Sequence, residues 1–183
     1  MLFRSLTNFP SATILRPSIV YSVDDNFTTN FMTLLNRMPF FPIYYNGKTK
    51  FMPIHCSDLT DIISHVIENN TNSQIIECVG PETISFKEIL NKLLKLIEKK
   101  RILIPSPLFF AKFTAAFFEL FPQPLITQDQ LRLLKYNNIL SKKYKNNSDI
   151  GVPSNKFFEA EVKKYCYMWK DGGQYATEKY QVK

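Results

Sequence analysis

The chain has 183 residues, 45% of them hydrophobic and 21% charged, which is enough for one globular domain with a sizeable core and excludes wholesale disorder. Its net charge of +7 comes from scattered lysines and arginines without a nucleic-acid motif, so we expect a solvated basic surface and no nucleic-acid partner. No apolar run reaches the roughly 20 residues that span a bilayer, and the first residues lack the apolar core of a signal peptide.

Strands and helices are predicted to alternate over the first half of the chain. β-Branched residues predict a strand over 13–20 that an Arg-Pro pair ends, and apolar residues at helical spacing predict a helix over 27–37. A polar side chain of residues 24–26 is expected to cap this helix. A short strand is predicted over 51–55, after a turn signal.

The same signals predict four more elements before residue 105. They are a helix over 57–67 with Ser57 and Asp58 as caps, a buried strand over 75–79, a helix over 85–98 that opens with a Ser85/Glu88 capping box, and a strand over 101–104. Strands that alternate with helices indicate parallel βαβ connections, and therefore the α/β class.

The last third of the chain is predicted to be mainly helical. A helix is expected from Leu108 to Phe121, and because only Lys112 and Glu119 are charged in it, its apolar arc is very wide. This helix is either buried on two sides or docked onto a protein partner or a membrane surface. Further elements are expected as a helix over 127–134, a polar loop over 141–151, a helix over 155–169 and a frayed tail over 174–183.

Several motifs, in this order and spacing, resemble one known family. They are the run ILRPSIV at 14–20, DDNF at 24–27, GKTKFMPIHCSD at 47–58 and YCYMWKDGGQ at 165–174. Together they are similar to the C-terminal half of an atypical, extended-type short-chain dehydrogenase/reductase, as found in the NAD(P)H-binding accessory subunit of respiratory complex I and its bacterial relatives.

The resemblance implies a fold and a domain organisation. We expect the C-terminal portion of a Rossmann-like doubly wound parallel sheet over 1–105, a small helical C-terminal lobe over 106–174 and a disordered tail over 175–183. The N-terminal half, which carries the dinucleotide fingerprint and the Tyr-x-x-x-Lys helix in this family, is expected to be missing.

Cofactor binding by this chain alone is expected to be weak. A Rossmann site needs a Gly-rich turn at a helix N-terminus to hold the pyrophosphate, and the five glycines of this chain form no such motif. The resemblance implies that Pro17, Ser18 and Ile19 line the nicotinamide end of NADP or NAD. Alternatively, the Arg-Pro pair merely ends a strand.

No catalytic residue is expected, so the chain is predicted to be inactive alone. Tyr44 and Lys48 have the Tyr-x-x-x-Lys spacing but straddle an Asn-Gly turn, and the second match, Tyr175 with Lys179, lies in the tail. The three cysteines, Cys56, Cys78 and Cys166, lack the spacing of a metal site or a disulfide framework, so we expect reduced, buried thiols and no metal.

Three weaker patterns have a structural alternative that we favour. Lys48 and Lys50 beside Gly47 suit an anion, although such turns are commonly just solvated. His55 and Asp58 resemble an acid–base pair, but Asp58 is well placed as a helix cap. His65 is expected to be a half-buried packing residue in the middle of a helix.

The sequence therefore predicts a truncated NAD(P)-binding reductase-like protein related to a complex I accessory or assembly subunit. Two alternatives stay open: an interaction module that docks on a membrane-bound respiratory partner through 108–121, and an oxidoreductase half completed in trans by a separately encoded N-terminal half. We expect a cytoplasmic protein, either free or peripheral on the inner face of the cytoplasmic membrane.

Overall fold

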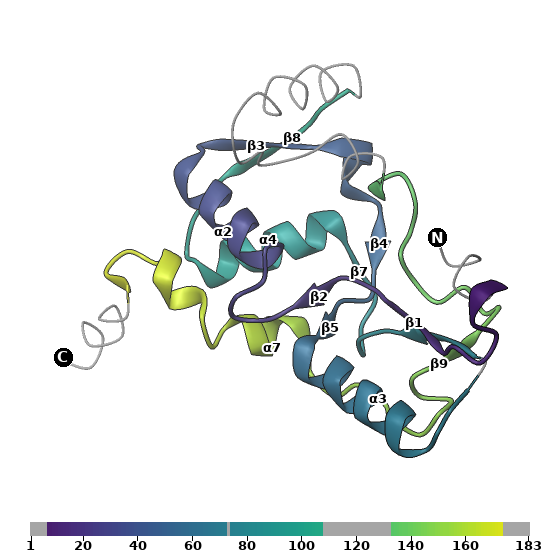
Figure 1. Cartoon of the computed structure of the whole chain (residues 1–183). Coiled ribbons are helices and arrows are strands. Elements are labelled where there is room, and N and C mark those ends of the chain that lie inside the picture. Colours follow the sequence, from purple (N-terminus) through teal and green to yellow (C-terminus); the bar gives the residue numbers. More distant parts are fainter. Residues whose placement is uncertain (1–6, 73, 108–132, 174–183) are drawn as a thin grey trace.

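A parallel sheet lies toward one side of the molecule, at the lower right in Figure 1. The computed structural model describes residues 7–72, 74–107 and 133–173. Its sheet has the order β1–β6–β9, and all neighbouring strands are parallel. The strands are β1 (Ile14–Pro17), β6 (Ile75–Cys78) and β9 (Lys145–Asn146), beside a second parallel pair, β2 (Val20–Tyr21) with β5 (Ile54–His55). This pairing confirms the predicted α/β class.

The helix α3 (Cys56–Glu68) packs with these strands and forms with them the smaller of the two cores that the described residues build. Ile54, Ile62, Ile76 and Cys78 are completely buried there. Just after the helix, Asn70 has a φ of 47°, in the left-handed region that commonly follows a helix end. Apolar contact between α3 and the strands thus holds the parallel sheet.

The larger core lies between three helices and two further strand pairs. Its helices are α2 (Thr28–Arg37), α4 (Phe86–Leu96) and α7 (Phe158–Val162); its strands are β3 (Phe40–Ile43) parallel to β8 (Ile102–Pro105), and β4 (Lys50–Phe51) antiparallel to β7 (Ile84–Ser85). Two short 3₁₀ helices, η1 (Tyr44–Gly47) and η2 (Cys166–Trp169), complete it. Completely buried side chains from all three helices, such as Met32, Leu90 and Phe158, meet in this core.

Local sequence signals account for the starts of two of these helices. The Ser85 hydroxyl accepts a hydrogen bond from the N–H of Glu88, and the Glu88 carboxylate accepts one from the N–H of Ser85, which confirms the predicted capping box of α4. Asp25 accepts hydrogen bonds from the N–H and the hydroxyl of Thr28 at the start of α2. Asp25, one of the three candidate caps at residues 24–26, therefore binds the first helical residue, whereas the N-cap position itself is Phe27, which makes no side-chain cap hydrogen bond.

Two predicted strands are each divided in the structure. The strand expected over 13–20 is interrupted at Ser18 and Ile19, between β1 and β2. The strand expected over 51–55 is wrong as a single element, because Phe51 pairs antiparallel to β7 whereas Ile54 pairs parallel to β2. The chain changes partners at Pro53, whose nitrogen has no hydrogen to donate.

The chain crosses itself closely at Gly80. The N–H of Gly80 donates to the carbonyl of Met52 over 3.1 Å. A Cβ atom at position 80 would lie 1.7 Å from the carbonyl oxygen of Pro53. Only glycine fits here without moving one of the two backbones.

The predicted helix over 155–169 is largely wrong, because only α7 and η2 form within it. The N–H groups of Asn155 and Lys156 donate to the Asp58 carboxylate, and that of Phe158 donates to Glu82, so the chain stays non-helical up to residue 157. The predicted polar loop over 141–151 also contains the missed strand β9. That strand lacks the apolar residues by which a buried strand is recognised.

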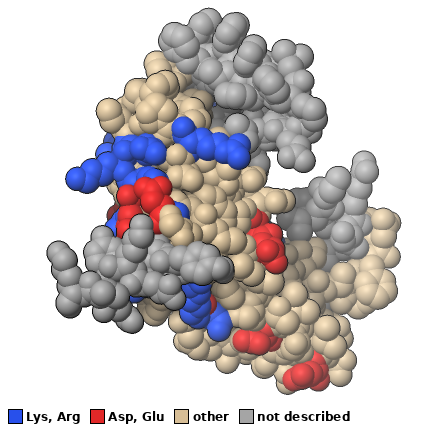
Figure 2. All heavy atoms as spheres, turned by 90° about the vertical axis from the view of Figure 1, so that its left-hand side faces the viewer, with Lys and Arg blue, Asp and Glu red and all other residues tan. Residues whose placement is uncertain are grey.

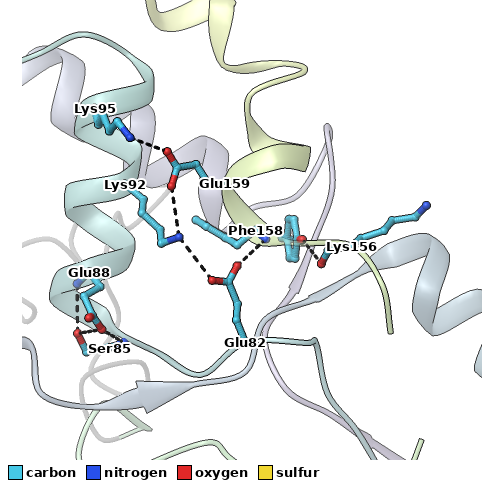
Figure 3. Close-up of polar contacts among 9 residues, drawn as sticks. Glu82, Ser85, Glu88, Lys92, Lys95, Lys156, Phe158 and Glu159 are labelled. Atoms are coloured by element: carbon cyan, nitrogen blue, oxygen red, sulfur yellow. Dashed lines mark hydrogen bonds and ion pairs between the residues drawn. The ribbon is translucent and has the colours of Figure 1, made fainter. Parts of the chain in front are cut away.

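Ion pairs hold α7 against α4 (Figure 3). The Lys92 ammonium lies 3.4 Å from a carboxylate oxygen of Glu82 and 3.3 Å from one of Glu159, and Lys95 lies 2.9 Å from Glu159. Lysines and arginines gather around acidic residues on one face of the molecule (Figure 2). The basic surface that was predicted to be only solvated is therefore partly an ion-pair network between α4 and the C-terminal segment.

The helix predicted over 108–121, residues 127–132 of the helix predicted over 127–134, and the tail over 174–183 lie outside the described residues. The domain boundary near residue 105 stays a prediction, although α7 and α4 share one core. Within the described part of the chain, no helix is both long enough and apolar enough to cross a membrane.

Gly80→Ala should lower the free energy of unfolding by about 3 kcal/mol, because the added Cβ overlaps the carbonyl of Pro53. Gly151→Ala is the matched control. Gly151 has a φ of 84° but no atom within 4 Å of the added Cβ, so only a backbone penalty of about 1–2 kcal/mol applies. If urea denaturation showed that the two variants lose the same free energy of unfolding, this explanation would be contradicted.

Glu159→Gln should lower stability at pH 7 by less than about 1 kcal/mol, the usual range for exposed ion pairs. Hydrogen bonds from Lys95 and Lys92 hold the pKa of Glu159 below its usual value. The contribution of Glu159 is therefore present above the ordinary glutamate pKa and is lost as the pH falls through the lowered pKa. The difference in stability between the variant and the wild type should be larger at pH 7 than at pH 3 in denaturation experiments, whereas the control Glu68→Gln, at an exposed position on α3, should show no such difference.

Candidate functional site

A cavity of about 680 Å³ lies where β1 and β6 end. Pro17 at the end of β1, Ile19 just beyond it and Val79 just after β6 form one wall. In parallel α/β sheets, ligands bind outside the carboxyl ends of the strands. The volume also falls within the range of roughly 300–1,000 Å³ that is usual for small-molecule sites. This cavity is therefore the candidate functional site.

The floor of the cavity consists of apolar side chains from the larger core. Leu34, Phe41, Phe51 and Phe86 are all buried. The ring of Phe31 packs edge-on against two of them, at centroid distances of 5.9 Å from Phe41 and 5.4 Å from Phe86. Such edge-to-face packing fixes the rings, so the floor is preformed.

Uncharged polar groups stand at the rim of the cavity. Asn26 precedes α2 and Asn30 lies in its first turn, and both are exposed residues that line the cavity. Asn137 also lines the cavity, and its side-chain oxygen accepts a hydrogen bond from the N–H of Lys50 over 2.9 Å.

One buried carboxylate neutralises the arginine at the site. The guanidinium of Arg16 lies 3.6 Å from Glu77, whose side chain is only 8% exposed. Glu77 also accepts a hydrogen bond from the N–H of Ser141 over 2.8 Å, and Arg16 lies over the ring of Tyr144 at 5.5 Å. The pair therefore fixes the chain after residue 140 against β6. The sequence analysis missed Glu77, because an acidic residue in the middle of a buried strand has no signal beyond its unusual position.

The three predicted cofactor residues have different positions. Pro17 and Ile19 line the cavity. The Ser18 side chain is buried; its hydroxyl donates to the carbonyl of Asn138 over 3.1 Å and accepts from the N–H of Met52 over 3.2 Å. Ser18 thus joins three segments at the cavity wall. Contact of these three residues with a cofactor stays a prediction.

His55 and Asp58 do not form a described acid–base pair. The Nδ1 atom of His55 lies 2.8 Å from the hydroxyl of Ser57 and accepts a hydrogen bond from the N–H of Ser57, so His55 is the cap of α3. The expected capping by Ser57 and Asp58 is therefore wrong. Burial lowers the pKa of His55, and its ring packs edge-on against Tyr21 at 5.3 Å. Asp58 is buried and holds the N–H groups of residues 155 and 156.

Tyr44 and Lys48 do not share a helical face. Tyr45 and Asn46 between them have left-handed φ values of 51° and 54°. Gly47 has a φ of 65°, and a Cβ there would lie 2.7 Å from the Cβ of Lys87, so its glycine serves close packing. Lys48 and Lys50 are exposed, and an anion site beside them stays a prediction.

The thiols are free, but not all of them are buried. Cys78 and Cys166 are buried, which raises the pKa of Cys78 to about 11. Cys56 is exposed at the start of α3, so the expectation of a buried thiol is wrong there. His65 is half-buried, as predicted. Among the described residues, no three His, Cys, Asp or Glu side chains are grouped as metal ligands would be.

Sequence comparison finds related subunits of respiratory enzymes, although no family model matches the chain. The chain is 30% identical over 106 residues to NADH dehydrogenase [ubiquinone] 1 alpha subcomplex subunit 9, mitochondrial, of Dictyostelium discoideum, covering 57% of this chain and 30% of that protein. It is 22% identical over 179 residues to the protein of the same name in Arabidopsis thaliana, covering 92% of this chain and 44% of that one. These subunits are homologues of this chain. The chain spans less than half of their length.

Solved structures of nucleotide-sugar enzymes share its fold. The chain matches the UDP-glucose 4-epimerase of Thermus thermophilus in complex with NAD at a TM-score of 0.60 and 12% identity, covering 92% of this chain and 50% of that one. It matches the dTDP-glucose 4,6-dehydratase of Streptomyces venezuelae with NAD bound at a TM-score of 0.57 and 14% identity, covering 91% and 46%. These matches confirm the predicted Rossmann-like fold.

Ser18→Ala should lower the free energy of unfolding by about 1–2 kcal/mol, because it leaves the N–H of Met52 and the carbonyl of Asn138 without their shared partner. Hydrogen exchange at the amide of Met52 should be faster as well. The control is Ser64→Ala, at an exposed position on α3. If the two variants were equally stable and exchanged equally fast at Met52, Ser18 would not join the segments as described.

Proposed function

We propose that the chain is the nicotinamide-side half of a reductase-type NAD(P)-binding module, that it has no catalytic activity alone, and that it serves as an accessory subunit of a respiratory NADH dehydrogenase-like assembly. Two comparisons support this proposal: the homologous subunits and the fold shared with NAD-bound enzymes. We further propose a cytoplasmic location, at the periphery of a membrane-bound assembly.

One observation carries the proposal. The carboxyl ends of β1 and β6 meet at a cavity lined by Pro17 and Ile19, but the sequence contains no Gly-rich turn. In this proposal the wall takes the nicotinamide end of NADP or NAD, whereas the Gly-rich turn whose backbone N–H groups hold a pyrophosphate is not found in the sequence. A segment that carries these donors has to come from elsewhere.

The edge of β1 supports completion by another segment. Among the described strands, β1 pairs with β6 alone and is an edge strand. The N–H groups of Ile14 and Ser18 donate to residues 74 and 78 on the β6 side, so by the alternation of a strand the N–H of Leu15 points to the opposite edge. We propose that a separately encoded N-terminal half adds its last strand at this edge.

An interaction module is the second candidate function, and an exposed apolar face supports it. Phe40, Ile102 and Ile104 lie on one face of the β3–β8 pair and are 53%, 69% and 45% exposed. Such a face is typical of a docking surface, and for the homologues the partners would be respiratory subunits. A third possibility, an oxidoreductase completed in trans, requires that the added half carry a Tyr-x-x-x-Lys helix.

The isolated chain should bind NADH and NADPH only weakly, because the pyrophosphate donors are absent from its sequence. We expect dissociation constants above about 100 µM by isothermal titration calorimetry. A dissociation constant near 1 µM, about −8 kcal/mol, would contradict the proposal.

Two variants of Leu15 test completion at the edge of β1. Leu15→Pro removes the N–H at the open edge as well as the side chain, whereas the control Leu15→Ala shortens the side chain and keeps the N–H. The tagged full chain, purified from its own host, should retain a polypeptide with a Gly-rich fingerprint in the wild type and in Leu15→Ala, and lose it in Leu15→Pro. The retained complex should bind NADH at least tenfold more tightly than the chain alone. Retention of that polypeptide by Leu15→Pro would reject the edge as the contact.

A further inference from the structure

The described lining of the cavity carries no net charge. Arg16 is its single cation and Glu77 its single anion, and these two side chains pair with each other at 3.6 Å. A diphosphate needs cations or several converging N–H groups. The structurally similar dehydratase and epimerases were solved with nucleotide or sugar nucleotide, but the described lining offers no unpaired cation for such a ligand.

The apolar floor favours a different ligand. The buried rings of Phe41, Phe51 and Phe86, together with Leu34, form a continuous apolar surface. Burial of apolar area there is favourable at roughly 25 cal/mol per Å². A charged ligand group in this part of the cavity would lose its hydration without a partner.

Neutral hydrogen-bonding groups at the rim complete the pattern. No described residue binds the side-chain amides of Asn26 and Asn30, which stand at the rim beside the start of α2. An amide offers one acceptor oxygen and two N–H donors, which suits a hydroxyl or carbonyl group. Polar groups at the rim and apolar groups at the floor match a molecule with one polar and one apolar end.

We propose that the cavity binds a neutral amphiphile, with its apolar body on the phenylalanine floor and an uncharged hydroxyl or carbonyl head at Asn26 and Asn30. This proposal depends on the proposed function in one respect only: it assumes that the cavity is the substrate side of the reductase-type site. The ligand class is thus a lipid-like molecule rather than a sugar nucleotide.

Displacement of the apolar fluorophore N-phenyl-1-naphthylamine from the full chain tests the proposal. 1-Monolauroylglycerol, which has a neutral head, should displace the probe at a concentration at least about fivefold lower than laurate, which has the same chain and an anionic head. Uridine diphosphate should not displace it. Displacement by uridine diphosphate as effective as that by 1-monolauroylglycerol would overturn the proposal.

Variants locate the binding. Asn30→Lys adds a cation at the rim and should reduce the preference for the neutral head at least about fivefold, whereas Ser64→Lys adds the same charge on α3, away from the cavity, and should leave the preference unchanged. Ile19→Phe fills part of the cavity and should weaken both ligands at least about fivefold, with folding checked by circular dichroism. If the Asn30→Lys variant kept the wild-type preference for 1-monolauroylglycerol over laurate, the proposal would be overturned. This result would count even if Ile19→Phe failed to fold, since Asn30 is exposed and its replacement should not disturb the fold.

The two proposals fail separately. If the completed complex did not bind NADH tightly but 1-monolauroylglycerol still displaced the fluorophore from the chain, only the proposed function would be rejected. Tight NADH binding by the complex without any preference for the neutral amphiphile would reject the ligand class alone.

Discussion

The pairing of β1 with β6 determines the geometry of the candidate site. Its register places Pro17 opposite Cys78, so that the two strands end together at the cavity. Just beyond the ends of β1 and β6, the N–H of Ser18 donates to the carbonyl of Cys78. The residues after these two strands also bind the segment at the start of β5: the N–H of Ile54 donates to the carbonyl of Ile19, and the N–H of Gly80 donates to that of Met52. Because main-chain groups make these bonds, the wall of the cavity is fixed before any side chain contributes.

Three carboxylates then position the part of the chain that follows residue 133. Glu77 binds the N–H of Ser141, Asp58 binds those of residues 155 and 156, and Glu82 binds that of Phe158. Glu77 and Asp58 are buried. A buried carboxylate is stable only when hydrogen-bonded or paired, so each of these two makes one position of the later segment strongly preferred.

The sequence predicted correctly those elements whose determining interactions lie within the element itself. The capping box at Ser85 and the apolar repeat after it gave α4 because both act within one helix. The division of the strand over 51–55 and the loss of the helix over 155–169 could not be predicted in this way, since each depends on partners far away in the chain, such as β7 and Asp58. The cavity was predictable only at Pro17 and Ile19, through the family resemblance, because its other lining residues come together only in the folded chain.

The hydrogen bonds that Asp58 and Glu82 accept from residues 155–158 affect how freely the sequence of this segment can vary. Both carboxylates accept from main-chain N–H groups, which every residue except proline provides. The side chains at positions 155 and 156 are therefore not what Asp58 recognises. Related chains can therefore differ in sequence at positions 155 and 156 while the path of the backbone stays the same. Sequence identity at these positions would then underestimate the structural similarity of distant relatives.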